Sequence, residues 1–462
     1  MDVVFDLVIR GGTLVTACET VQTDVGVRDG KINAIGERLQ GHEMVDADGL
    51  WVLPGAVDPH VHLQMPTGAT MSSDDWRTGT VAAACGGTTT VIDFVEPEGD
   101  ESLMDAFEKR HAEAEGQAVI DYGLHMTLTN AEDATLAEIP AVVDAGMPSF
   151  KTYTTYEGFK LNDREFLRVM DAVREAGGLI MVHSENDAVV SEATAALLEA
   201  GEIGPSAHPK SRPAAAEAEA IHRMLALAEV TGVHLYIVHI STARGAQLLA
   251  EARGCGARHV DGETCPQYLL LTEAAYDQPG FEGAKVVCAP PLRTATDNAA
   301  LWNALAADAL QTVGTDHCPF FYESQKTLGR HDFSQIPSGL PGIEARLALL
   351  HTFGVRAGRI SANRWIELCC TAPAQIFGLA PRKGTLAPGA DADIVLFDPH
   401  KRVTLSADVL HEHVDYTPYE GLELTGYPVA TFVHGRKVVQ DGAWLDQESG
   451  GHYLPAQKTD DS

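Results

Sequence analysis

The chain has 462 residues, 45% of them hydrophobic, which is typical of a soluble globular protein with a substantial core. Its 65 acidic residues outnumber its 33 lysines and arginines, and the formal net charge of −32 argues against nucleic acid and anionic membrane as partners. No window approaches the ~18 consecutive apolar residues of a membrane-spanning helix. The negative charge either serves only to keep the protein soluble or reflects adaptation to high salt, where screening weakens the repulsion between surface carboxylates.

The start of the chain lacks the basic and apolar regions of a signal peptide, so we expect a cytoplasmic protein. The eight cysteines are sparse and include no Cys-x-x-Cys motif, which favours reduced thiols over disulfides or a thiolate metal site.

Residues 1–53 predict the first part of a small β domain. Short alternating segments at residues 6–10, 24–28 and 31–35 are separated by Gly11-Gly12 and Asp29-Gly30, which is typical of antiparallel strands joined by turns.

Residues 54–378 change to short apolar runs alternating with Ala- and Glu-rich helical stretches. Eight buried strands separated by helices favour a parallel (β/α)8 barrel of the TIM type. The predicted strands are Val57–Leu63, Thr88–Phe94, Tyr122–Thr127, Ser149–Tyr153, Leu179–His183, His234–His239, His259–Glu263 and Thr312–Thr315. Predicted helices include Asp75–Ala84, Glu165–Ala176, Ala214–Val230 and Asp297–Ala307.

Residues 379–450 return to strands and turns, for example at 391–397, 430–435 and 438–442. Because this pattern resembles that of residues 1–53, we expect both chain ends to form one smaller, β-sandwich-like domain beside the barrel. The polar residues 451–462 predict a loose tail.

The pair His60-x-His62 closes an apolar run, Trp51-Val-Leu-Pro-Gly-Ala-Val-Asp-Pro-His-Val-His-Leu63. Residues two apart on a strand share a face, so both imidazoles can reach one cation. Alone the pair is weak evidence, because two such histidines are as often surface or core residues.

Three more polar residues lie at predicted strand ends: His183, His239 and Asp316. The carboxyl ends of barrel strands converge on one mouth, where side chains from different strands can meet. Each histidine taken singly is more often a hydrogen-bonded core residue, but together they predict a metal site.

Lys151 lies in another predicted strand, Ser149–Tyr153, close to the barrel mouth, where an ammonium would face divalent cations. One interpretation is a partly buried lysine reaching a carboxylate. The other is that the neutral amine captures CO2 and becomes an anionic carbamate able to bridge two metals.

Motifs along nearly the whole chain resemble those of the cyclic amidohydrolases, in particular the dihydropyrimidinase and hydantoinase branch. They are Pro54-Gly-Ala-Val-Asp-Pro-His-Val-His62, Gly86-Gly-Thr-Thr-Thr90, Ser149-Phe-Lys151, Val182-His-Ser-Glu-Asn186, Ile237-Val-His-Ile-Ser241, Gly262-Glu-Thr-Cys-Pro-Gln-Tyr268, Ala289-Pro-Pro-Leu-Arg293, Val313-Gly-Thr-Asp-His-Cys-Pro319 and Lys383-Gly-Thr-Leu-Ala-Pro-Gly389. The resemblance implies hydrolysis of hydantoins or dihydropyrimidines to N-carbamoyl amino acids.

The resemblance also implies a binuclear centre. His60, His62 and Asp316 match the ligands of the more buried metal, His183 and His239 match those of the second, and Lys151 matches a lysine carboxylated by CO2 (N6-carboxylysine) that bridges both. A bridging hydroxide would be the nucleophile. The ligand types suit two Zn ions, with Mn or Co as substitutes.

Two catalytic roles and two binding positions follow from the same resemblance. Asp316 would shuttle a proton to the leaving ring nitrogen, and Tyr156 would stabilise the developing oxyanion, although as a loop residue it is also explained by packing. Backbone groups at Ala289 and Ser338 would hold the imide ring, but both side chains depart from the Ser and Asn usual at these positions. The resemblance further implies a homotetramer or homodimer.

Three alternatives are weighed against this interpretation. Dihydroorotases carry an arginine just after the His-x-His pair, where this chain has Leu63-Gln64, and the same absence argues more weakly against allantoinase. Scaffold relatives with this fold have lost metal ligands, whereas every ligand position is filled in this chain.

Overall fold

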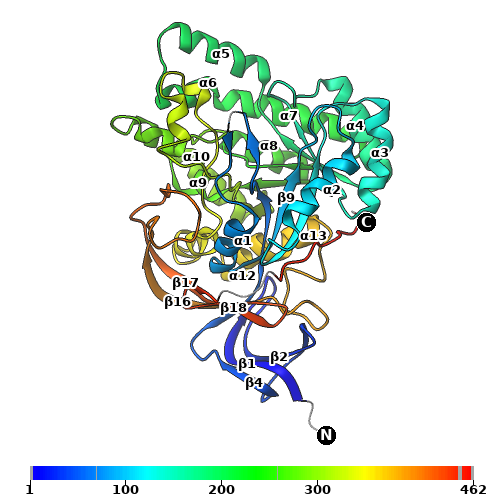
Figure 1. The fold of residues 1–462 in the computed structure, drawn as a ribbon, viewed down its shortest axis with the longest axis vertical. Coiled ribbons are helices and arrows are strands. Elements are labelled where there is room, and N and C mark those ends of the chain that lie inside the picture. The colour runs from blue at the N-terminus through cyan, green and yellow to red at the C-terminus, as the bar shows by residue number, and fades with distance from the viewer. Residues whose placement is uncertain (1–3, 69, 258, 446–449, 459–462) are drawn as a thin grey trace.

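The computed structural model describes residues 4–68, 70–257, 259–445 and 450–458. A parallel barrel forms the larger part of the molecule, and a second sheet built from both chain ends lies below it (Figure 1). Six of the eight cysteines are buried and all are free thiols, as expected.

The barrel consists of eight parallel strands in the sheet order β15-β14-β13-β12-β11-β10-β9-β6. The backbone N–H of His62 donates to the carbonyl of His317 (2.8 Å), which joins the first strand to the segment after the last. All eight predicted strands are present, with ends that differ by at most two residues. Their bounds are β6 Ala56–Val61, β9 Thr88–Val95, β10 Asp121–Thr127, β11 Ser149–Tyr153, β12 Leu179–His183, β13 His234–Ile237, β14 Val260–Thr264 and β15 Thr312–Val313.

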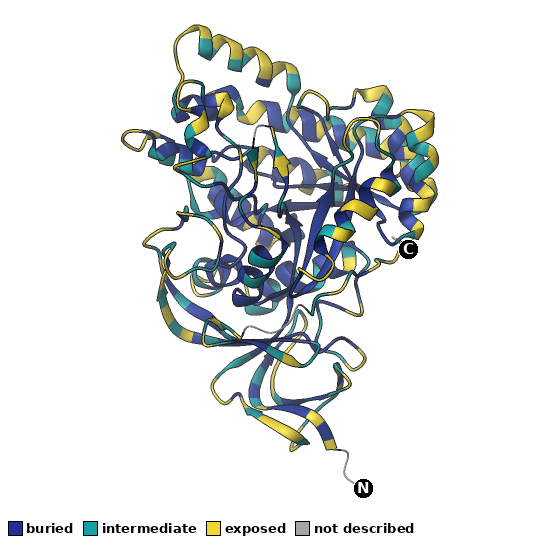
Figure 2. Ribbon diagram, in the orientation of Figure 1, coloured by how far each residue is buried: buried dark blue, intermediate teal, exposed yellow. Residues whose placement is uncertain are grey.

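Helices lie around the outside of the barrel, and most of them bury the side that faces it, whereas α5 (Asp187–Glu199) buries only Val190 (Figure 2). In α4 (Asp163–Ala176) Asn162 and Glu165 form a capping box, Gly177 ends the helix with φ of 80°, and residues 166, 169, 170 and 173 face the core at helical spacing. The other long helices are α1 Trp76–Cys85, α2 Leu103–Ala114, α3 Asp133–Asp144, α5 Asp187–Glu199, α7 Ala214–Thr231, α8 Ala243–Gly254 and α10 Ala295–Ala306.

Shorter elements occupy the connections. They are β7 Pro66–Thr67, β8 Thr70–Met71, α6 His208–Ser211, α9 Pro266–Leu270, α11 Arg346–Leu350, α12 Ala362–Ile366, α13 Ala372–Ile376, the 3-10 helices η1 Pro205–Ala207, η2 Glu273–Asp277, η3 Glu282–Val286, η4 Lys326–Gly329 and η5 Phe333–Gln335, and the π-helical turns η6 His351–Val355 and η7 Glu367–Thr371. Within the described residues, no helix is both long and apolar enough to cross a membrane.

The two chain ends pair into one nine-stranded sheet, in which β5 hydrogen-bonds with β16. The sheet is mostly antiparallel, but β1 pairs in parallel with β4 and β5. It is a single hydrogen-bonded sheet, and Leu7, Ile9, Ile394 and Phe432 share one core cluster on it. Its strands are β1 Val4–Val15, β2 Thr20–Arg28, β3 Lys31–Gly36, β4 Gln40–Asp46, β5 Trp51–Pro54, β16 Ile394–Thr404, β17 Glu423–Val433, β18 Arg436–Gln440 and β19 Ala443–Trp444.

The expectation of a loose tail is wrong for residues 451–458. The backbone N–H of Leu454 donates to the carbonyl of Tyr122 (2.7 Å), that of Tyr122 donates to His452 (3.0 Å), and the Leu454 side chain is 1% exposed. The segment docks beside the start of β10 and so satisfies backbone groups there. Residues 459–462 of the predicted tail lie outside the described residues.

Candidate active site

Chemically active side chains gather at the carboxyl ends of the barrel strands. His60 lies in β6, Lys151 in β11 and His183 at the end of β12. His239 follows β13 by two residues, and Asp316 follows β15 by three. Because all eight strands are parallel, these positions share one mouth of the barrel.

One group of donor atoms surrounds Asp316. Its Oδ1 lies 3.3 Å from Nε2 of His60 and 3.2 Å from Nε2 of His62. Lys151 Nζ lies 3.4 Å from the same Nε2 of His60. The ligand atoms of His60, His62 and Asp316 all lie within 4.8 Å of one another, which is close enough to share one ion.

A second group adjoins the first. Nδ1 of His183 lies 3.0 Å from Nε2 of His239, and the ring centroids of His239 and His60 are 5.5 Å apart. The structure therefore brings all six predicted ligand residues together, and their role as ligands stays a prediction.

Two carboxylates that the sequence analysis assigned no role orient these histidines. Glu263 Oε1 lies 2.7 Å from Nδ1 of His60, and Glu185 Oε2 lies 2.8 Å from Nε2 of His183. Each contact leaves the other ring nitrogen directed at the cluster, as carboxylates do behind metal-binding histidines. The sequence could have indicated both carboxylates, because Glu263 ends a predicted barrel strand and Glu185 follows His183 by two residues.

Burial disfavours the charged forms of several basic groups in the site. It lowers the pKa of His60 and His239 well below the usual value, and that of His183 also falls. Burial likewise lowers the pKa of Lys151 to about 8. Neutral imidazole and amine groups are the forms that can bind a metal or react with CO2.

Three residues of the site have left-handed backbone conformations that side chains rarely adopt. The φ angles are 79° for Tyr156, 40° for His239 and 52° for Asp316. Such strain persists where the surrounding structure fixes it, and it concentrates at functional sites.

Tyr156 lies between His183 and Arg212. Its ring centroid is 5.0 Å from that of His183, and the Arg212 guanidinium lies 5.2 Å from the ring. Burial raises the pKa of Tyr156 to about 12, so the hydroxyl keeps its proton at neutral pH and can donate it in a hydrogen bond.

A comparison with known proteins agrees with this arrangement. Residues 51–438 match the model of the amidohydrolase family. The chain belongs to the amidohydrolase family.

The relatives of this amidohydrolase cover nearly its full length. It is 44% identical to a D-hydantoinase of Streptomyces coelicolor, over 97% of both chains, and 44% identical to a D-hydantoinase of Geobacillus stearothermophilus, over 97% of this chain and 96% of the other. The crystal structure of a dihydropyrimidinase from Brevibacillus agri is 43% identical, with a TM-score of 0.97 over 98% of this chain and 99% of that one. The resemblance to the hydantoinase and dihydropyrimidinase branch is thus confirmed.

The residues of this amidohydrolase fit the metal on which its family depends. Imidazole nitrogens and a carboxylate oxygen converge. Glu263 and Glu185 orient the rings of His60 and His183, and burial favours the neutral forms of His60, His183 and His239. Without a metal, buried imidazole nitrogens such as those of His183 and His239 would have mainly one another as polar partners.

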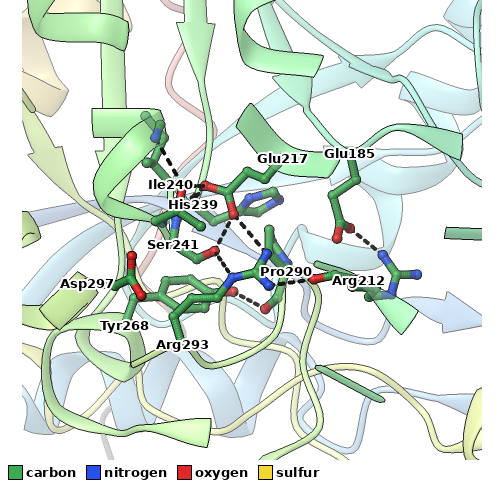
Figure 3. Close-up of polar contacts among 12 residues, drawn as sticks. Glu185, Arg212, Glu217, His239, Ile240, Ser241, Tyr268, Pro290, Arg293 and Asp297 are labelled. Atoms are coloured by element: carbon green, nitrogen blue, oxygen red, sulfur yellow. Dashed lines mark hydrogen bonds and ion pairs between the residues drawn. The ribbon is translucent and has the colours of Figure 1, made fainter. Parts of the chain in front are cut away.

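A buried ionic network ties the second histidine group of this amidohydrolase to the segment that contains Ala289 (Figure 3). Glu217 accepts hydrogen bonds from the backbone N–H of Ser241 (3.0 Å), two residues after His239, and forms an ion pair with Arg293 (3.2 Å). Arg293 also donates through Nε to the Ser241 hydroxyl (3.0 Å) and through Nη1 to the carbonyl of Arg212. The Arg212 guanidinium in turn pairs with Glu185. The network therefore fixes the positions of His183, His239 and residues 289–293 relative to one another.

Ala289 and Ser338 belong to two segments that are joined by backbone contacts. Gly339 donates its N–H to the carbonyl of Val287 (3.0 Å), and Cys318, two residues beyond Asp316, donates its own to the carbonyl of Leu340 (3.0 Å). Ala289 is partly buried and Ser338 is exposed. The two predicted ring-binding positions therefore lie near each other and beside the segment that follows Asp316.

Proposed function

We propose that this cyclic amidohydrolase opens the ring amide of hydantoins or dihydropyrimidines and releases N-carbamoyl amino acids. The observation that carries the proposal is the convergence of His60, His62, Lys151, His183, His239 and Asp316 in one barrel mouth. The names of the relatives, D-hydantoinase and dihydropyrimidinase, support the substrate class.

His60, His62 and Asp316 would hold one divalent ion, and His183 and His239 a second, with Lys151 between them. Imidazole and carboxylate donors suit Zn, and Mn or Co could substitute. Divalent ions bound in such a site supply Lewis-acid activation of water and of the substrate carbonyl.

Lys151 would bridge the ions as N6-carboxylysine. The neutral amine adds to CO2, forms the N–C bond and loses a proton, which gives an anionic carbamate with two oxygens. With a pKa of about 8, roughly a tenth of the Lys151 side chains are neutral at pH 7, against fewer than about one in a thousand for an ordinary lysine. The reactive form is therefore populated at neutral pH.

Asp316 would take the proton of the attacking water and pass it to the departing ring nitrogen, which is a poor leaving group unless protonated. Burial alone would raise the pKa of Asp316, but the adjacent His60 and His62 lower it, so the carboxylate is free to accept a proton. Tyr156 would donate its hydroxyl hydrogen bond to the oxyanion that develops on the ring carbonyl.

Ala289 and Ser338 would hold the imide ring through their backbone groups, so the change of side chain from the usual Ser and Asn leaves the contacts possible. We also propose a homotetramer or homodimer. The cytoplasmic location and the absence of nucleic-acid partners stay predictions from composition and charge.

Ring opening of dihydrouracil, hydantoin, both enantiomers of 5-phenylhydantoin and allantoin tests the function. We expect activity on hydantoin or dihydrouracil, loss of activity when a chelator removes the metal, and recovery with Zn, Mn or Co. Opening of allantoin alone would reassign the substrate, and a purified chain with no bound divalent ion and no activity would favour a non-catalytic scaffold.

A further inference from the structure

Lys326, the first residue of η4, is a completely buried lysine whose amine hydrogen-bonds to three backbone oxygens and lies 5.5 Å from the centre of the Phe320 ring. Its Nζ donates to the carbonyls of Val287 (2.9 Å), Pro337 (2.6 Å) and Gly339 (2.8 Å). Its side chain is 0% exposed, and among the described residues the charged groups that act on its pKa are the thiols of Cys288 and Cys318 and no carboxylate. A cation at this position therefore needs an explanation other than charge pairing.

The three carbonyls require a charged amine. An ammonium has three N–H donors, whereas a neutral amine has only two. Burial lowers the pKa of Lys326 to about 7. The hydrogen bonds to three carbonyl oxygens favour the protonated form, because only that form has a donor for each of them. By contrast, the buried amine of Lys383 lies among the carboxylates of Asp121, Asp391 and Asp393.

The three carbonyls belong to the two segments that contain the proposed ring-binding positions. Val287 precedes Ala289 by two residues, while Pro337 and Gly339 flank Ser338 on either side. The carbonyl of Val287 accepts both from Lys326 and from the N–H of Gly339 (3.0 Å). The Lys326 amine thus adds to the direct backbone contact between the two segments, because it contacts both of them.

Each segment is also held by a neighbouring part of the chain, and for the segment around Ser338 that neighbour follows Asp316. A Cβ added at Gly339 would lie 2.3 Å from the carbonyl oxygen of Cys318, and φ of 154° at this glycine is unsuited to other residues. On the other segment, Nε2 of His208 lies 2.8 Å from the carbonyl of Cys288. A shift of the segment around Ser338 would therefore move it relative to Cys318 and Asp316.

We propose that Lys326 is a positioning residue that holds the segments around Ala289 and Ser338 at the separation needed to bind the cyclic imide ring. The inference rests on the proposed function, because only ring binding makes that separation matter. Lys326 does not touch the reacting atoms, so its loss should weaken substrate binding more than it slows the chemical step.

The test compares Lys326→Met and Lys326→Gln with the wild-type enzyme and with Lys285→Met. Lys285 lies in the neighbouring η3, is 31% exposed, and pairs with Glu282 in the same turn (2.6 Å). Steady-state kinetics on hydantoin are measured with metal-loaded enzyme, together with metal content and thermal unfolding. Gln keeps two N–H donors, so it should retain part of the effect.

We expect KM to rise about tenfold or more in Lys326→Met, less in Lys326→Gln, and to change by less than about twofold in Lys285→Met, with kcat and metal content nearly preserved. A folded Lys326→Met variant with a normal KM would overturn the inference. So would parallel losses of kcat and metal, or failure of both Lys326 variants to fold, since either would show a general structural role. Inactivity of the wild type and of Lys285→Met would instead refute the proposed function.

Discussion

Lys151 differs from an ordinary lysine in its surroundings. It is 1% exposed, its Nζ lies 3.4 Å from His60, and the rings of Phe94 and Tyr153 lie 4.9 and 5.3 Å from the amine. Burial favours the neutral amine that CO2 chemistry needs, which is why the residue is suited to carboxylation.

Replacement of Lys151 by Ala should abolish ring opening, because the variant cannot form the proposed bridging carbamate. Short carboxylic acids such as acetate or propionate should restore part of the activity by occupying its place. The control is Lys109→Ala on α2, a lysine 49% exposed and paired with Glu98, which should leave the activity unchanged. Full activity in Lys151→Ala would contradict the carbamate role.

Tyr156→Phe isolates one hydroxyl. The ring should keep its contacts with His183 and Arg212, so metal content should stay near that of the wild type, while kcat falls by about 100-fold or more through loss of one oxyanion donor. Turnover and bound metal are measured on the same preparations. Proportional loss of both would mean that Tyr156 is a structural residue.

At the scale of elements, the two ends of the barrel strands have different tasks. The carboxyl ends hold the candidate ligands, whereas the start of β10 anchors the terminal sheet. Asp121, the first residue of β10, pairs with Lys383 and with His434 (2.8 Å), and Lys383 also pairs with Asp393 (2.8 Å), just before β16. The motif that begins at Lys383 is thus explained by a buried ionic junction away from the chemistry.

Removal of the Lys383 charge should destabilise this junction strongly. Lys383→Met leaves buried carboxylates uncompensated, and we expect the free energy of unfolding to fall by about 3–5 kcal/mol. Arg382→Met is the matched control, because Arg382 and Lys383 both pair with Asp391 (2.7 and 3.0 Å) but Arg382 is 46% exposed. Its replacement should lower the free energy of unfolding by less than about 1 kcal/mol. Urea unfolding measures both, and equal effects would contradict the distinction.

At the scale of the whole molecule, the net charge of −32 is the dominant electrostatic feature. Self-repulsion among surface carboxylates opposes the compact state, and salt shortens its range from about 10 Å at 0.1 M to about 3 Å at 1 M. The same charge would also keep polyanions away from the barrel mouth.

If the acidic composition reflects adaptation to high salt, Tm should rise as KCl increases from 0.1 M to about 2 M, because screening relieves the repulsion. Differential scanning calorimetry measures the change, with sucrose of equal osmolality as a control for general exclusion effects. A Tm that is unchanged or lower in molar KCl would reject the high-salt interpretation and leave solubility as the explanation.

The sequence by itself determined the succession of strands and helices and the gathering of the candidate ligands. Runs such as Leu179–His183 are apolar throughout because both faces of a barrel strand are buried, and a polar residue at the end of such a run must lie at the barrel mouth. That reasoning places His60, His183 and Asp316 together without coordinates.

Only the tertiary structure decided which groups support those residues. The contact between Glu263 and His60 spans 203 positions, the three carbonyls around Lys326 come from two separate segments, and the tail at Leu454 docks on β10. None of these pairings has a local pattern, because each forms only after the barrel has closed and brought distant backbone into contact. The spacing of apolar residues in the sequence shows which side of a helix or strand is buried. Which residues pack against that side depends on the path of the whole chain.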